Sequence, residues 1–172
     1  MLLSCNHLTK SYGGQRVLDD LSFRIDSQAD NRDLLLIGPS GVGKTTLLRI
    51  LAGLENPDSG TIDITMGEAA TAGANLRIGM VFQEDRLLDA LDAVANVSAV
   101  SPMISRERAA AELAKILPED ALTKPVRELS GGMRRRVAIV RALLPASDLL
   151  LMDEPFTGLD DQTRQQVIHY IF

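Results

Sequence analysis

The residues with the clearest chemistry form a glycine-rich run that ends in lysine and threonine. The run Gly38–Thr45 fits the spacing G-x-x-x-x-G-K-[ST], which is typical of a loop that binds phosphate groups. Its glycines let the backbone wrap closely, so that backbone N–H groups and the start of the next helix point at an anion. The predicted nucleotide contacts are Gly38, Pro39, Ser40, Gly41, Val42, Gly43, Lys44, Thr45 and Thr46.

Two side chains of this loop have separate predicted roles. The Lys44 ammonium reaches the β- and γ-phosphates, and the Thr45 hydroxyl ligates Mg²⁺. The apolar run Leu34–Ile37 before the loop is typical of a buried parallel strand. After the loop, apolar residues recur at helical spacing, at Leu47, Ile50, Leu51 and Leu54. This order of strand, loop and helix favours a phosphate site over an ordinary glycine-rich turn.

Two adjacent carboxylates form a second candidate group. Asp153 and Glu154 directly follow Leu149–Met152, an apolar run expected to form a strand covered on both faces. In an open α/β sheet, ligands gather at the carboxyl ends of the strands. We therefore expect Asp153 to hold Mg²⁺ through water and Glu154 to accept a proton from the attacking water. Taken in isolation, the pair would be assigned to an acidic turn before Pro155.

A second candidate anion site lies at Leu129–Met133, where Ser130, Gly131 and Gly132 open an amphipathic helix. The bare N–H groups and the positive end of such a helix favour an anion. Because the chain already has one phosphate loop, this site is expected to serve the nucleotide of another molecule. An ordinary serine cap remains an equal alternative when these residues are taken alone.

The elements that must position these residues can be predicted from periodicity and turn signals. Short strands are expected at Leu2–Leu8, Leu21–Ile25, Thr61–Thr65 and Ile78–Phe82, and a loop at Gly67–Asn75. From Leu87 to Leu117 the pattern becomes helical, with Ser105 as an N-cap. A connector bracketed by prolines then leads to the helix that Ser130 caps.

The composition is that of an ordinary globular domain, with 45% hydrophobic and 24% charged residues in 172. A net charge of −5 offers no broad basic field for a nucleic-acid backbone. The basic run Arg134–Arg136 is expected to be the solvated face of a helix. A lone cysteine, Cys5, favours a reducing compartment, and neither a secretory signal nor a stretch of ~20 apolar residues is apparent. A role at a membrane would therefore need a partner.

Taken in their order along the chain, these motifs resemble the ATP-binding cassette of ABC transporters over nearly the whole length. Gly38–Thr45, Leu129–Met133 and Leu149–Pro155 look like its Walker A, signature and Walker B motifs. Gln83 and the run Gly158–Asp160 are similar to its Q-loop and D-loop. The family resemblance implies an α/β P-loop NTPase fold, with a RecA-like parallel sheet core, an antiparallel β subdomain and an inserted α-helical subdomain.

The resemblance also implies roles for three further residues and a pair of cofactors. Tyr12 matches the aromatic of the A-loop that stacks on adenine, although strand packing alone would also explain it. Gln83 is expected to contribute to catalysis and to the Mg²⁺ site, and Asp160 to contact the nucleotide. The implied cofactors are ATP and Mg²⁺.

The implied assembly is a head-to-tail dimer, either a homodimer or a paired cassette, with two ATP molecules between the cassettes. The implied partners are transmembrane permease subunits, so the location would be cytoplasmic and peripheral on the inner face of the cell membrane. No nucleic-acid partner is expected. The implied domain layout places 1–86 with 145–172 in a β subdomain and P-loop core, and 87–144 in a helical subdomain.

The chain stops before the position at which the family carries a switch histidine. His169 is expected to be an ordinary helix residue. The apolar stripe in Val167–Phe172 has no stop signal. We therefore expect a C-terminal truncation, with the last strands and the switch histidine missing, and slow hydrolysis of the bound ATP.

The first hypothesis for function is the ATP-binding and ATP-hydrolysing subunit of an importer. Phe82–Leu88 and the methionine in the signature are most similar to the branch that imports nitrate, sulfonate and taurine. Alternatives are a soluble ABC ATPase without a transport role and a module that binds ATP but barely hydrolyses it. The soluble class is disfavoured because no sustained heptads interrupt the cassette and 172 residues cannot hold two cassettes. A small-molecule kinase or GTPase would have no need of Leu129–Met133.

Overall fold

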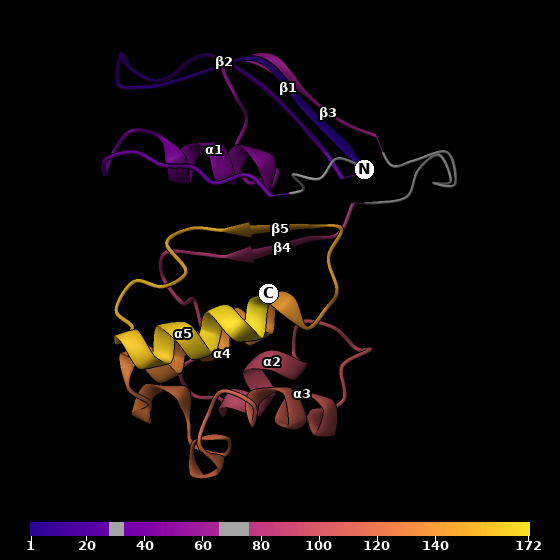
Figure 1. Ribbon diagram of the computed structural model, residues 1–172, viewed down its shortest axis with the longest axis vertical. Helices are drawn as coiled ribbons and strands as arrows, with labels where there is room; N and C mark the ends of the chain where they lie inside the picture. Colours follow the sequence, from indigo (N-terminus) through magenta and orange to yellow (C-terminus); the bar gives the residue numbers. More distant parts are fainter. Residues whose placement is uncertain (28–32, 66–75) are drawn as a thin grey trace. The chain divides into compact units, whose positions relative to one another are not determined.

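The chain divides into two compact units, Met1–Asn75 and Leu76–Phe172. The computed structural model describes residues 1–27, 33–65 and 76–172, so the predicted loop at Gly67–Asn75 lies outside the described residues. Each unit has its own sheet and its own helix or helices (Figure 1). The layout predicted from the resemblance, with 87–144 as a separate helical subdomain, stays a prediction.

An antiparallel sheet in the order β2-β1-β3 is the frame of the first unit. The central strand β1 (Leu2–Tyr12) pairs with β2 (Gln15–Asp26) and with β3 (Ser59–Thr65). Gly13 and Gly14, with φ of 55° and 84°, close a tight hairpin between β1 and β2. The three strands predicted in this region are confirmed, and β2 begins earlier than expected because the turn takes only two residues.

A β-bulge explains how β1 buries residues of both odd and even number. Leu3 and Cys5 are buried with the period of two that a strand dictates. The register then shifts between Cys5 and Leu8, where His7 has a φ of 54°, and this brings Leu8 onto the buried face. Burial, followed by the charge of Asp63, raises the pKa of the Cys5 thiol to about 11. The thiol is therefore protonated and unreactive at neutral pH.

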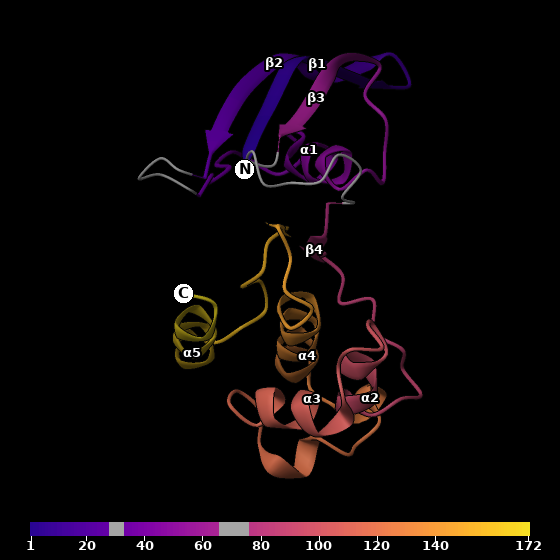
Figure 2. The ribbon, with the colours of Figure 1, turned by 90° about the vertical axis from the view of Figure 1, so that its right-hand side faces the viewer.

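The helix after the glycine-rich loop, α1 (Lys44–Leu51), lies along one side of this sheet (Figure 2). Its apolar stripe is buried as predicted at Leu47, Ile50 and Leu51. Leu54 was expected on the same stripe but is exposed, because α1 ends before it. Gly53, with a φ of 68°, closes the helix, and its N–H and that of Leu54 bond back to the carbonyls of Ile50 and Arg49.

The strand predicted at Leu34–Ile37 is not formed in the described structure. These residues have no ladder partner, and Leu34, Leu35 and Ile37 are 47%, 79% and 85% exposed. An apolar run becomes a strand only where a neighbouring strand satisfies its backbone groups. In the first unit β2 and β3 pair with β1, and neither of them pairs with Leu34–Ile37.

The second unit carries the parallel pair β4 (Ile78–Val81) and β5 (Leu149–Met152), both close to their predicted bounds. Ile78 lies opposite Leu149, and Val81 lies opposite Met152, so the two strands end at the same level. At Gly79 a Cβ atom would stand 2.7 Å from the carbonyl oxygen of Ala142. The glycine therefore lets the helix that contains Ala142 pack directly on the strand.

The helices of the second unit surround the long helix α4 (Gly131–Leu143). α4 lies between the strand pair and the helices α2 (Ala93–Ser98) and α3 (Arg106–Leu113), with α5 (Asp161–Ile171) beside it (Figure 2). Short 3-10 turns occur at Glu119–Ala121 and Val126–Glu128. No helix among the described residues is long and apolar enough to cross a membrane.

Two apolar clusters fix α4 on opposite sides. Val137 and Val140 belong to the cluster with α2 and α3, and Ile139 belongs to the cluster with β4 and α5. Ser105 caps α3 by accepting a hydrogen bond from the Arg108 N–H, as predicted. His169 lies in α5, which agrees with its expected role as an ordinary helix residue.

Replacement of Leu113 by alanine should destabilise the second unit strongly. Leu113 is fully buried in the cluster around α3 and α4, so the change leaves a cavity that costs about 2–5 kcal/mol. Urea unfolding followed by far-ultraviolet circular dichroism measures the loss. The matched control is Met103→Ala, whose side chain is 83% exposed and should cost less than about 0.5 kcal/mol. Equal effects of the two changes would contradict the assigned core.

Candidate functional site

The glycine-rich loop, predicted to bind phosphate groups, leads into the start of α1. Gly43 occupies the N-cap position with a φ of 104°, and no side chain caps the helix. The N–H groups of the first helical turn have no acceptor within the helix, so they remain available to a ligand. A Cβ at Gly43 would lie 2.9 Å from both Cγ1 and the carbonyl oxygen of Val17. The loop is therefore pressed against β2 and needs glycine there.

The Lys44 side chain folds back over the loop that precedes it. Its Nζ atom donates to the carbonyl oxygens of Gly38 and Pro39 at 2.7 and 2.9 Å. These bonds place a positive charge over the same concave turn that the first N–H groups of α1 face. A group of phosphate oxygens fits this arrangement, because both the ammonium and the N–H groups need acceptors.

Tyr12 stands at the end of β1 in the same unit, with 45% of its surface exposed. Its hydroxyl donates to Glu55, and the Lys10 ammonium lies 5.4 Å from the ring centroid. The hydrogen bond from Tyr12, followed by that from Lys10, lowers the pKa of Glu55. Glu55 lies in the segment that follows α1, whereas Lys10 belongs to β1 itself. The two contacts hold the ring at a fixed place while leaving it partly exposed.

The two predicted carboxylates lie at the carboxyl end of β5 in the second unit. Asp153 is 4% exposed, and its N–H donates to the Val81 carbonyl oxygen at 2.9 Å, which ties it to the end of β4. Glu154 is exposed and has a φ of 49°, a left-handed conformation that non-glycine residues adopt at a cost. Its carboxylate accepts a hydrogen bond from the Thr157 hydroxyl at 3.2 Å.

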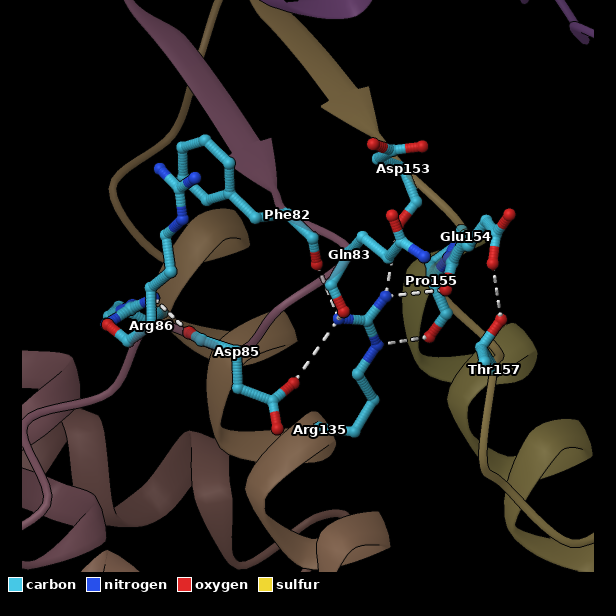
Figure 3. A network of polar contacts seen from close by, with 10 residues as sticks. Phe82, Gln83, Asp85, Arg86, Arg135, Asp153, Glu154, Pro155 and Thr157 are labelled. Atoms are coloured by element: carbon cyan, nitrogen blue, oxygen red, sulfur yellow. Dashed lines mark hydrogen bonds and ion pairs between the residues drawn. The ribbon is translucent and has the colours of Figure 1, made fainter. Parts of the chain in front are cut away.

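Gln83 stands two residues after the last residue of β4, at the strand end that neighbours the two carboxylates (Figure 3). The segment Phe82–Arg86 that contains it is held by two arginines of α4. Arg141 donates to the carbonyl oxygens of Asp85 and Arg86, both at 2.7 Å. Burial lowers the pKa of the Arg141 guanidinium, with the charge of Asp85 opposing that shift.

The expectation that Arg134–Arg136 forms a solvated face was wrong for Arg135. Its side chain is 4% exposed and lies between two chain segments, as Figure 3 shows. Arg136 is partly buried and donates to the carbonyl oxygens of Ile116 and Gly132. Arg134 agrees best with the expectation, because its guanidinium forms an ion pair with the exposed Asp89 carboxylate. The physical reason is that α4 is enclosed on several sides, so a short basic run on it cannot stay on one face.

Ser130 opens α4 as its N-cap and accepts a hydrogen bond from the Met133 N–H at 3.3 Å. Gly131 has open space around it, and a Cβ at Gly132 would lie 3.5 Å from Leu159. The signature segment therefore lies beside the predicted D-loop. Asp160 caps α5 with both of its carboxylate oxygens, and the N–H and hydroxyl of Thr163 lower the pKa of Asp160.

The predicted site residues thus fall into two groups, one in each unit. Tyr12 and the loop from Gly38 to Thr46 belong to the first unit. Gln83, the signature residues, the two carboxylates and Asp160 belong to the second. Motif spacing did not predict that Arg135 would be buried beside these residues. One signal was present, because Arg135 stands one helical turn before Ile139, which is fully buried.

A phosphate-binding loop at a helix start, with an acidic pair after a parallel strand, defines the class of P-loop nucleotide-binding proteins. The sequence model of the family described as ABC transporter matches residues 18–157, and the chain belongs to that family. The predicted recognition and fold class are thereby confirmed.

Several curated proteins resemble the chain to a similar degree. It is 39% identical over 171 residues to the spermidine/putrescine import ATP-binding protein PotA of Marinobacter nauticus, covering 95% of this chain and 45% of that one. It is 38% identical over 170 residues to the aliphatic sulfonates import ATP-binding protein SsuB 2 of Burkholderia cenocepacia, covering 96% and 60%. The chain thus spans about half the length of these curated relatives.

A solved structure supports the fold. It is a dimeric ATP-binding cassette in a post-hydrolysis state, bound to ADP and Pi, and it matches with a TM-score of 0.82 at 27% identity. The match covers 98% of this chain and 81% of that one.

Replacement of Gly43 by alanine should disrupt the phosphate-binding loop. Alanine is strained at a φ of 104°, and its Cβ would clash with the backbone of Val17, so we expect a loss of about 1–3 kcal/mol or more. Thermal unfolding and titration with ATP measure the change. Gly131→Ala is the control, because a Cβ there meets open space and the helix start tolerates it. A Gly43→Ala chain as stable as this control would contradict the loop geometry.

Proposed function

We propose that this chain is the ATP-binding and ATP-hydrolysing part of an importer-type ABC transporter that drives solute transport through a separate transmembrane partner. The observation that carries the proposal is the start of α1, where an uncapped helix end and the Lys44 ammonium face one glycine-lined turn. Membership of the ABC transporter family supports ATP as the ligand of that turn.

In this proposal the first unit binds the triphosphate and the base of ATP. The N–H groups of Gly43, Lys44 and Thr45 donate to phosphate oxygens, and the Lys44 Nζ leaves the loop carbonyls to contact the β- and γ-phosphates. The exposed Tyr12 ring, held through Glu55, stacks on adenine. In the first unit the Thr45 hydroxyl would hold Mg²⁺, and in the second unit Gln83 and Asp153 would be the oxygen ligands offered to it, directly or through water. When bound, Mg²⁺ neutralises charge on the phosphate oxygens.

The second unit supplies the hydrolytic chemistry. Glu154 accepts the proton of a water molecule whose oxygen attacks the γ-phosphorus, and the bond from that phosphorus to the β-γ bridging oxygen breaks to release ADP and phosphate. The Thr157 hydroxyl, 3.2 Å from the Glu154 carboxylate, holds its direction. Gln83 orients the water from the neighbouring strand end.

Ser130, Gly131 and Gly132 are proposed to contact the nucleotide of a second cassette. Their helix start is positive and its first turn contains no acidic residue. The dimeric state of the solved cassettes that the chain resembles supports this arrangement. Asp160, which caps the neighbouring α5, keeps the D-loop in place beside the signature residues and lies close to the same nucleotide.

The direction of transport and the location are inferred from the relatives. Import proteins for polyamines, sulfonates, phosphonates and sulfate match at 38–40% identity, which supports import and a position at the inner face of the cell membrane beside permease subunits. Export is the second candidate, because a Nod factor export ATP-binding protein of Ralstonia nicotianae matches at 38%. Reconstitution of the complete transporter in vesicles, with labelled solute placed on one side at a time, distinguishes the two.

Replacement of Lys44 by alanine should weaken ATP binding about tenfold to a hundredfold. The change removes a charge-assisted contact, worth on the order of 1.5–3 kcal/mol, while the backbone N–H groups remain. Isothermal titration with Mg-ATP measures the affinity. The control is Arg49→Ala, which removes an exposed cation from the same helix. Equal affinity of the Lys44→Ala chain and the wild type would refute the assignment of the loop.

Replacement of Glu154 by glutamine should lower turnover by about 10²–10⁴-fold while ATP still binds. The amide keeps the shape of the side chain but cannot accept the proton. Steady-state release of phosphate and titration with ATP measure the two effects. Thr163→Val is a useful comparison, because it removes an α5 hydroxyl whose hydrogen bond, among the described residues, is to Asp160 alone. A Glu154→Gln chain with undiminished turnover would exclude Glu154 as the base.

A further inference from the structure

One side chain joins the two segments that carry the proposed catalytic residues. The guanidinium of Arg135, from α4, donates to the carbonyl oxygens of Phe82 and Gln83 at 2.5 and 3.2 Å. It also donates to those of Asp153, Glu154 and Pro155, at 3.1, 2.5 and 2.9 Å. The first two carbonyls follow β4 and the other three follow β5, so Arg135 spans the ends of both strands (Figure 3).

Apart from Asp85, Arg135 contacts backbone carbonyls and makes no hydrogen bond to the side chains of Gln83, Asp153 or Glu154. In Figure 3 the carboxylates of Asp153 and Glu154 point away from the guanidinium. Its only anionic partner among the described residues is Asp85, whose carboxylate oxygen lies 3.3 Å from Nη1. Arg135 therefore affects the positions of Gln83, Asp153 and Glu154 and does not itself take part in their chemistry.

The backbone that Arg135 holds is strained at the residue proposed as the base. Glu154 has a φ of 49°, a conformation that persists only when surrounding contacts enforce it. The carbonyls on either side of Glu154, together with its own, all accept hydrogen bonds from Arg135. Loss of these three bonds would remove the contacts that keep this backbone in place.

The geometry requires arginine and not merely a positive charge. A guanidinium has five N–H donors in a rigid, planar fork, which can reach carbonyls on two sides at once. A lysine ammonium has three donors on a single atom and cannot span the same set.

We propose that Arg135 is a positioning residue that sets Gln83 and Glu154 relative to each other by binding both strand ends. The catalytic part of this inference rests on the proposed function, whereas the structural part does not. Binding of ATP without Mg²⁺ by the first unit should not depend on Arg135, since the contacts of Arg135 lie in the second unit.

Hydrogen exchange and kinetics of Arg135→Gln test the inference together. We expect faster amide exchange in both segments, 82–87 and 153–159, by about tenfold as the local contacts are lost. We expect kcat for ATP hydrolysis to fall by about 10²-fold, as displacement of a catalytic group dictates. The Kd for ATP, measured without Mg²⁺, should change less than about threefold. Arg135→Lys should fold with the charge retained and should still show fast exchange in at least one segment.

Arg141→Gln is the matched control. Arg141 is also an arginine of α4, but among the described residues its guanidinium donates only to carbonyls of the first segment, at Asp85 and Arg86. Its loss should speed exchange in 82–87 alone. If Arg135→Gln leaves segment 153–159 unchanged, or if Arg135→Lys restores both exchange and kcat, the positioning role is refuted. If the wild-type chain neither binds nor hydrolyses ATP, the proposed function fails, and the exchange pattern still decides whether Arg135 joins the two segments.

Discussion

The second unit depends on how a buried guanidinium is compensated. A charge removed from water costs several kcal/mol unless it is paired and its hydrogen-bonding groups are satisfied. Arg135 has one carboxylate, Asp85, and five backbone carbonyls as partners, and no buried side-chain polar atom among the described residues lacks one. The same carbonyls lie at the ends of β4 and β5, where the strand ladder no longer provides donors. The guanidinium supplies the donors that the carbonyls at the strand ends need, and these carbonyls accept its hydrogen bonds. The two strand ends, and with them the carboxylates, are thereby held in place.

Much of the candidate site could be predicted because it consists of local patterns. The phosphate loop requires glycines at fixed spacing, and the helix starts at Ser105 and Ser130 require a side-chain oxygen, so both appear as short motifs. The contacts of Arg135 join residues 18 to 53 positions apart in the chain, and no short motif encodes them. The helical repeat alone indicated that Arg135 shares a face with Ile139 and Ala142, which both pack against the strands.

The elements that were predicted wrongly depend on partners distant in sequence. An apolar run such as Leu34–Ile37 predicts burial, but a strand needs a neighbour with free backbone groups, and that is a property of topology. The prediction for Leu54 was wrong for a local reason, because α1 ends at Leu51 and the left-handed Gly53 turns the chain away from the helix. The bulge at His7 could not be seen either, since the period of two in β1 breaks there without a glycine or proline to mark it.

The distribution of carboxylates over the helix starts supports a shared role for the two glycine-rich motifs. Among the five α-helices of the described residues, α2 and α5 are capped by aspartates, and α3 has Glu107 in its first turn. α1 and α4 alone have neither an acidic cap nor an acidic residue in the first turn. A carboxylate there would occupy the N–H groups and repel a phosphate, although it would stabilise an isolated helix. Stability alone would favour acids at all five starts. Their absence from the two that follow Gly38–Gly43 and Leu129–Ser130 is what binding of an external anion requires.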